Sequence, residues 1–228
     1  MAELGRIEKP TIESFAGKKK LYRVRSVYLP ENPSEEYRGL FDKYWDDMAI
    51  QIEKIEATGK TRKIFCEHIF SAGEEALDPF ARGNERIANL MRRKIGEGAA
   101  RLPLETEEIY GPLLDWKNCL QVVGTREVFK QVLDFYAWLL EKRYLYILDV
   151  IKRNLAEGEA GLLIIRDEDI AKFRLTDDVE VFFITPPSYD NILKWIREEK
   201  VSVPASVRSI PPTAQSVRQR GSAQFSHA

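Results

Sequence analysis

The sequence contains very little cysteine and histidine. Of its 228 residues, two are cysteines and two are histidines. Cys66 and Cys119 lie far apart in stretches that otherwise look buried, which argues against a disulfide framework and favours a reducing compartment. His68 is the single histidine before the C-terminal tail, so a metal site or a general base that uses imidazole has to include it.

Long hydrophobic runs are also missing. Uninterrupted apolar runs, such as residues 137–140 and 181–184, are far shorter than the roughly 20 residues that cross a bilayer. The first 20 residues are polar, with acids from Glu3 onward and no apolar signal region. We therefore expect a soluble, cytoplasmic protein that does not enter the membrane.

The chain has no excess of either charge and no nucleotide-binding signature. Its formal net charge is −1, and the basic runs at 18–20 and 92–94 are not interleaved with aromatic residues, so we expect no nucleic-acid partner. The motifs G-x-G-x-x-G, G-x-x-x-x-G-K-[ST], G-x-S-x-G and C-x-x-C do not occur. Nucleotide-dependent redox chemistry and P-loop hydrolysis are thereby disfavoured.

Hydrophobic periodicity predicts an α/β fold, with a layered sheet of about four strands flanked by helices. Strands are expected at 20–29, 62–66, 161–165 and 179–184. Helices are expected at 35–58, 84–95, 105–122 (kinked or broken at Gly111-Pro112), 126–156 and from Ser188 onward. Ser34 and Asn84 are the expected caps of two of these helices. Residues 1–17 are predicted to be a flexible N-terminus, and residues 201–228 a disordered tail. Residues 18–200 are predicted to form one α/β domain, with possible halves at 18–124 and 125–200.

Candidate site residues follow two of the predicted strands. In α/β sheets, ligands usually bind beyond the carboxyl ends of the strands. After the strand at 62–66, that rule selects Glu67, His68 and Ser71. After the strand at 161–165, it selects Arg166, Asp167, Glu168 and Asp169. An imidazole beside a carboxylate can move protons or hold a divalent ion, although strand alternation lets at most two of residues 66–68 face the same way.

Two resemblances to protein families extend beyond single motifs. The segments KLYRVRSVYLPENPSEEYRGLFDKYWDDM, KIFCEHIF, KRYLYILDVIKRNLAEGEAGLLIIRDED and DDVEVFFITPPSYDNILKWIREE together resemble a prokaryotic family with no assigned activity. The second half is more distantly similar to the TraB and EreA/ChaN-like superfamily: Arg143 matches its helix arginine, and Glu67 with His68 matches its early Glu/His element. The resemblance implies metal-dependent or hydrolytic chemistry, but no histidine directly follows residues 161–165 in this chain, where the superfamily carries one.

Three functions follow from these observations. The favoured hypothesis is a non-catalytic or degenerate module that binds a small molecule or a protein partner, because no complete catalytic motif is present. The second is a metal-dependent or acid–base hydrolase with Glu67, His68 and Arg143 as catalytic residues, the acids at 167–169 as ligand groups and a divalent metal as the candidate cofactor. The third is an adaptor that uses its basic tail. The sequence does not decide whether the protein is an enzyme, nor its oligomeric state.

Overall fold

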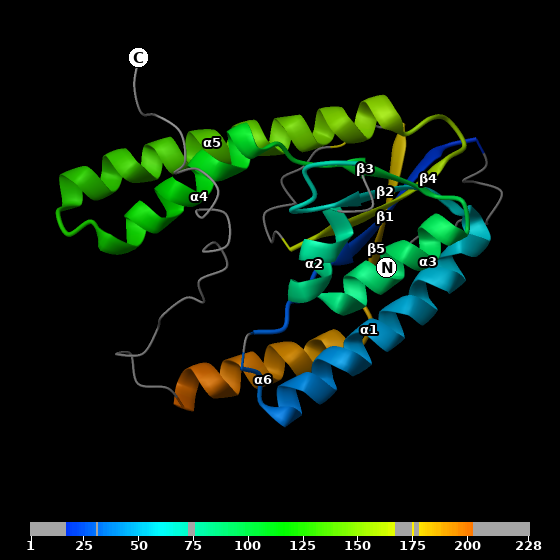
Figure 1. Cartoon of the computed structure of the whole chain (residues 1–228), viewed down its shortest axis with the longest axis horizontal. Helices are drawn as coiled ribbons and strands as arrows, with labels where there is room; N and C mark the ends of the chain where they lie inside the picture. The colour runs from blue at the N-terminus through cyan, green and yellow to red at the C-terminus, as the bar shows by residue number, and fades with distance from the viewer. Residues whose placement is uncertain (1–16, 31, 73–75, 167–174, 176–177, 203–228) are drawn as a thin grey trace, which may run out of the picture.

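The fold is built on one parallel sheet of five strands. The computed structural model describes residues 17–30, 32–72, 76–166, 175 and 178–202. Within them the strand order is β3-β2-β4-β1-β5, and every neighbouring pair is parallel (Figure 1). The strands are β1 (Lys19–Arg25), β2 (Thr61–Cys66), β3 (Ala100–Pro103), β4 (Ala160–Ile165) and β5 (Val179–Ile184). The predicted α/β class is confirmed, whereas the predictions for residues 1–16 and 203–228 lie outside the described residues.

The edge strand β3 is absent from the sequence prediction, which gave four strands. It has four residues, and it pairs with β2 alone, from Lys63 opposite Ala100 to Cys66 opposite Pro103. A segment this short contains too few residues to show period-two alternation. Its register with β2, and therefore the position of the residues that follow it, is visible only in the structure.

The described helices are α1 (Glu35–Ile55), the short 3-10 helix η2 (Glu56–Thr58), α2 (Leu77–Gly83), α3 (Glu85–Gly96), α4 (Glu107–Val122), α5 (Arg126–Asn154) and α6 (Ser188–Ser202). Two of them, α1 and α3, begin directly after their predicted caps. The Ser34 hydroxyl accepts from the Tyr37 N–H at 3.1 Å, and the Asn84 side chain accepts from the Ile87 N–H at 3.2 Å. Both caps satisfy a backbone donor that has no partner inside its own helix.

The expected break at Pro112 does not occur, because α4 runs through this residue. Proline removes one backbone donor, which costs most when the unpaired carbonyl four residues earlier is buried. Here Pro112 and Glu108 are both exposed, so water can satisfy the freed carbonyl. None of the described helices, α4 and the 29-residue α5 included, has the combination of length and apolarity that bilayer crossing requires.

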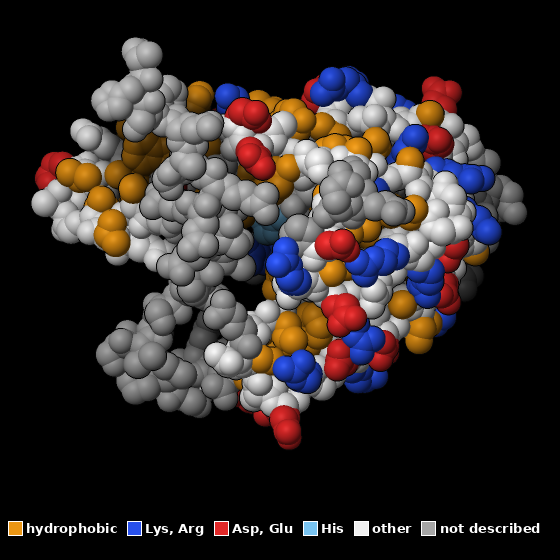
Figure 2. All heavy atoms as spheres, viewed as in Figure 1, with side chains coloured by type: hydrophobic (Ala, Val, Ile, Leu, Met, Phe, Trp, Pro, Cys, Tyr) orange, Lys and Arg blue, Asp and Glu red, His pale blue; other side chains and the backbone are white. Residues whose placement is uncertain are grey.

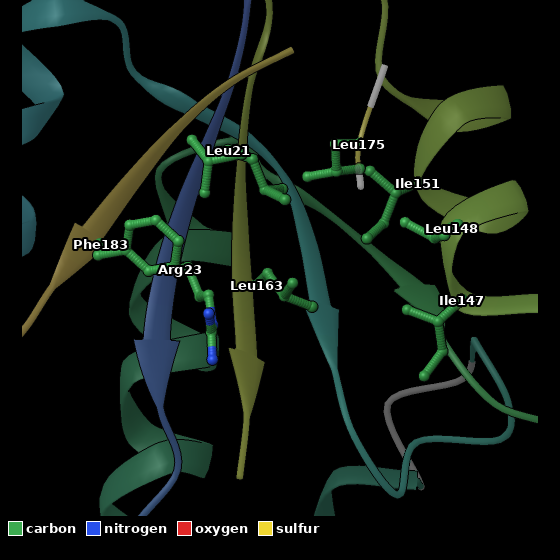
Figure 3. Close-up of a pocket in the computed structure, with 9 residues that line it drawn as sticks. Leu21, Arg23, Ile147, Leu148, Ile151, Leu163, Leu175 and Phe183 are labelled. Carbon is green, nitrogen blue, oxygen red and sulfur yellow. The ribbon is translucent and has the colours of Figure 1, made fainter. Parts of the chain in front are cut away.

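Helices cover both faces of the sheet. Side chains such as Tyr22, Ile64 and Ile164 point to one face and pack among α1, α3 and α6. The alternate positions, such as Phe65 and Leu163, pack against the C-terminal half of α5. A small apolar hollow remains beside α5, lined by Leu21, Arg23, Ile147, Leu148, Ile151, Leu163, Leu175, Val181 and Phe183 (Figure 3).

Gly161 on β4 marks a close approach between β4 and the α5 layer. A Cβ atom at this position would lie 2.9 Å from Phe65 Cε2 and 3.4 Å from Leu155 Cδ1. We expect Gly161→Ala to lower the free energy of unfolding by about 1–3 kcal/mol, the usual cost of overfilling a packed core. Chemical denaturation measures this change, and Gly39→Ala in α1, where a Cβ meets open space, should be neutral or slightly stabilising. An unchanged free energy in Gly161→Ala would show that this layer is loosely packed.

The N-terminal half of α5 extends beyond the sheet together with α4 (Figure 1). Val128 and Phe129, apolar residues at its start, expose 45% and 42% of their surfaces. The buried residues of this half are Val132, Leu139 and Arg143, which lie on the side of α5 that packs on α4 and the sheet.

Candidate functional site

The site lies at the carboxyl edge of the sheet, where the chain leaves β1, β2 and β3. Because all five strands are parallel, these three exits lie at the same edge. Backbone hydrogen bonds continue the pairing past the strand ends, from the Glu67 N–H to the Ile164 carbonyl at 3.0 Å and from the Ser26 N–H to the Ile165 carbonyl at 3.2 Å. The residues that follow the strands are therefore held rigidly in place.

A sharp turn at His68 changes the direction of the chain after β2. His68 has a φ of +61°, a conformation that costs energy for a residue with a Cβ. The Cys66 side chain lies in the core, on the face of the sheet that α1, α3 and α6 cover. Burial, together with the carboxylates of Glu67 and Glu105, raises the pKa of its thiol. The expectation that at most two of residues 66–68 face the same way is consistent with this geometry, and a third polar ligand comes from another strand.

Three potential metal ligands meet at this edge. Ligand atoms of Glu67, His68 and Glu105 all lie within 4.8 Å of one another. Both glutamates are buried, and His68 is partly buried. Imidazole together with carboxylates is a donor set found in transition-metal sites, where each ligand lies about 2.0–2.2 Å from the ion.

Glu67 is oriented by hydroxyl groups from the chain after β1. Ser26 Oγ donates a hydrogen bond to Glu67 Oε1, and the Tyr28 hydroxyl donates to the same oxygen at 3.2 Å. Its other oxygen, Oε2, lies 3.8 Å from Arg143 Nη2. The carboxylate thus has a fixed position with Oε2 turned toward Arg143.

Two tyrosines hold the His68 ring at its two nitrogens. The Tyr28 hydroxyl is 3.2 Å from Nδ1, and the Tyr110 hydroxyl is 2.9 Å from Nε2. Because Tyr28 has a single hydroxyl proton and donates it to Glu67, it accepts from the Nδ1–H, and Nε2 keeps its lone pair toward Tyr110. Burial, assisted by the positive charges of Arg143, Arg166 and Lys117, lowers the pKa of His68 to about 4. The ring is therefore neutral near pH 7, which is the form that binds metals.

Arg143 reaches the cluster from α5 and neutralises it only in part. Its Nη2 donates to Glu105 Oε1 at 2.5 Å, and it lies close to Glu67 as well. Two carboxylates, those of Glu67 and Glu105, thus meet one guanidinium in a buried place. Glu105 Oε2 has no hydrogen-bond partner among the described residues. A buried carboxylate oxygen without a donor is costly, so this atom is suited to accept a cation.

The other predicted site residues take different positions. Arg166 follows β4, and its guanidinium lies 5.2 Å from the centre of the Tyr28 ring, at the border of the cluster. Ser71 is exposed, its backbone carbonyl accepts from Arg101, and no hydrogen bond among the described residues joins its side chain to the cluster. The remaining three candidates, Asp167, Glu168 and Asp169, lie outside the described residues.

Four residues of the cluster were missed by sequence reasoning, namely Ser26, Tyr28, Glu105 and Tyr110. Glu105 follows β3 in the same way that Glu67 follows β2, so the strand-end rule would have selected it had β3 been recognised. Ser26 and Tyr28 also follow a strand, because β1 ends at Arg25. The sequence prediction extended this strand to residue 29, so the strand-end rule did not select them. Only the register of the sheet brings these residues together.

In comparisons with known proteins, no protein-family model, curated protein or solved structure matches the chain.

The lowered pKa of His68 predicts a pH dependence of stability. Its pKa is about 4 in the folded protein against an ordinary value of 6.5, so between these pH values the unfolded chain binds more protons. Above pH 6.5, His68 therefore has no effect on the free energy of unfolding. As the pH falls toward 4, it lowers that free energy by about 2–3 kcal/mol. Denaturation measured at several pH values should show this slope in the wild type and a reduced slope in His68→Asn, since asparagine tolerates positive φ. Equal slopes in the two proteins would show that the ring is already solvated in the fold.

Proposed function

We propose that this protein is a metal-dependent hydrolase whose ion is held by Glu67, His68 and Glu105. The observation that carries the proposal is the gathering of these three ligand atoms within 4.8 Å at the carboxyl edge of a parallel sheet. Glu105 Oε2, which has no hydrogen-bond partner among the described residues, supports a cation at this position. The similarity to the TraB and EreA/ChaN-like superfamily points to the same chemistry through Glu67, His68 and Arg143.

The donor set favours a transition metal over magnesium or calcium. One imidazole nitrogen and two carboxylate oxygens suit zinc, manganese or iron, whereas calcium and magnesium take oxygen ligands almost exclusively. His68 is neutral near pH 7, so no proton has to leave it before an ion binds. Three protein ligands leave coordination positions for water or substrate, the arrangement found in catalytic zinc sites.

Each residue around the ligands has a role in this proposal. What a bound ion supplies is a water molecule of lowered pKa. Ser26 and Tyr28 fix Glu67, and Tyr28 also fixes the tautomer of His68. The Tyr110 hydroxyl lies 2.9 Å from His68 Nε2; with an ion on this nitrogen, the hydroxyl would be available to donate its proton to a leaving group. Burial first, and then Glu105, raises the pKa of Tyr110 to about 12, so the hydroxyl keeps its proton at pH 7.

The experiment begins with the full-length protein, treated with a chelator and titrated calorimetrically with zinc or manganese. One ion per chain is expected, and the loaded protein should hydrolyse members of a panel of chromogenic carboxylic and phosphoric esters that the chelated protein leaves intact. Binding of one ion without hydrolysis of any ester would retain the metal site and overturn the enzyme assignment. Absence of binding would overturn both.

A second candidate function is a metal-free binding module, and one observation favours it. Arg143 already pairs with Glu105, and both nitrogens of His68 already lie at hydrogen-bond distance from tyrosine hydroxyls. In that case the cluster is a buried polar network that shapes the edge of the sheet, and the small molecule or protein partner binds around Arg166. The same titration separates the two functions, because this module takes up no metal.

A further inference from the structure

The arm formed by α4 and the N-terminal half of α5 carries an unusual apolar stripe that faces solvent. Val128, Phe135, Trp138 and Leu145 expose 45%, 51%, 59% and 60% of their surfaces. Their spacing of seven, three and seven residues places them on one side of α5, at the a and d positions of a heptad pattern. We call these four residues the α5 stripe. Apolar side chains also gather on the part of the surface formed by the arm in Figure 2.

Most of the α5 stripe lies outside the packing of the arm, where Phe135 alone among the four has a ring contact with α4. The side of α5 that contacts α4 and the sheet carries the buried residues Val132, Leu139 and Arg143. From α4, Trp116 stacks on Phe135 with ring centres 4.9 Å apart and widens the stripe. The four side chains together expose on the order of 400 Å² of apolar surface, the size of patches that are often functional on single proteins.

A row of acidic residues runs along one edge of the stripe. Glu127, Asp134 and Glu141 are exposed and recur every seven residues, one position before each a position. In coiled coils these g positions select the partner by charge. Among the described residues none of the three acids forms an ion pair or a hydrogen bond. Lys142 is the one basic residue at an a or d position, and its ammonium lies 5.6 Å from the centre of the Trp138 ring.

This charge pattern disfavours a second copy of the chain as the partner. A symmetric antiparallel pair of α5 helices that matches Val128 with Leu145 and Phe135 with Trp138 brings Asp134 of each copy within two positions of Glu141 of the other. Such like-charge contacts oppose pairing. The exposed area is also about half of the roughly 800 Å² that each partner buries in a standard interface.

We propose that the α5 stripe docks an amphipathic helix of another protein, with leucine-like residues on its apolar side and lysine or arginine along the edge that meets Glu127, Asp134 and Glu141. A helix of about three heptads matches the 18 residues from Val128 to Leu145 in length. Apolar contact with Trp138 and Phe135 supplies affinity, and the acidic row selects basic partners. This inference is independent of the metal site.

A pair of synthetic peptides tests the proposal against the full-length protein. One is a 21-residue helix with leucine at a and d and lysine at e and g, and the other has glutamate in place of lysine. In fluorescence anisotropy at low salt, the lysine peptide should bind at least tenfold more tightly than the glutamate peptide, and added salt should reduce this preference. Equal affinity for the two peptides would overturn the proposal.

Variants of the arm make the test specific to this surface. Trp138→Ala and Phe135→Ala should each weaken binding of the lysine peptide about tenfold, while Ile50→Ala, which alters an equally exposed residue on α1, should not. Simultaneous Glu127→Lys, Asp134→Lys and Glu141→Lys should transfer the preference to the glutamate peptide. Unchanged binding in Trp138→Ala overturns the proposal, as does a dimer in sedimentation that Trp138→Ala abolishes, because a second copy would then occupy the stripe.

Discussion

Replacing Glu105 by glutamine is expected to weaken zinc binding by more than about 100-fold, beyond the 10- to 100-fold losses seen when only a partner of a metal ligand is removed. Glutamine has nearly the same shape, and its carbonyl oxygen can still accept the Arg143 hydrogen bond that Oε1 now accepts. What disappears is the negative charge, together with Oε2, the buried oxygen that has no donor among the described residues. The measurement is a calorimetric zinc titration near pH 7.5.

Two further variants serve as controls for this prediction. Glu108→Gln alters an exposed acid three residues later and should leave zinc affinity unchanged. His68→Asn, which removes another of the three ligands, should lose affinity to a similar degree. Retention of full affinity in Glu105→Gln would remove Glu105 from the ligand set and leave too few protein ligands for the proposed centre.

Replacing Arg143 by methionine is expected to lower the free energy of unfolding by about 3–5 kcal/mol in chelator-treated protein. Methionine fills much of the same volume but leaves the buried Glu67 and Glu105 without the cation that lies between them. Bound zinc replaces part of the lost positive charge. The stabilisation by a saturating zinc concentration should therefore be larger in Arg143→Met than in the wild type. Chemical denaturation with chelator and with zinc measures both quantities.

Two further variants identify the cause of the Arg143 effect. The double variant Arg143→Met/Glu105→Gln should recover much of the lost stability, because one of the two unpaired charges is then gone. Lys142→Met, at an exposed neighbouring position, should be nearly neutral. If zinc stabilised wild type and Arg143→Met equally, the guanidinium and the ion would not share the same electrostatic environment, contrary to the proposed site.

The sequence predicts the regular parts of the fold well because they depend on local chemistry. Ser34 and Asn84 mark the starts of α1 and α3 through short-range capping, and the apolar runs of β4 and β5 mark two strands. The errors come from effects that are not local. β3 is a strand because β2 lies beside it, and α4 continues through Pro112 because the affected carbonyl faces water.

The candidate site could be predicted only in part for the same reason. Glu67 and His68 follow a recognisable strand, so the strand-end rule finds them, and Arg143 enters through the superfamily resemblance. Glu105 and Tyr110 lie about 40 residues further along, and their contacts with His68 and Arg143 depend on sheet register and on the packing of α5. The exposed α5 stripe shows a further limit, since helical periodicity does not distinguish an apolar face that meets the core from one that meets another molecule.

The most direct test of the metal centre is X-ray absorption at the zinc edge on the full-length protein loaded with one equivalent of zinc. We predict a first shell of nitrogen and oxygen atoms at about 2.0–2.1 Å with the scattering signature of a single imidazole, and loss of that signature in His68→Asn. A spectrum without imidazole, or one that His68→Asn leaves unchanged, would contradict the assignment of Glu67, His68 and Glu105 as the metal site.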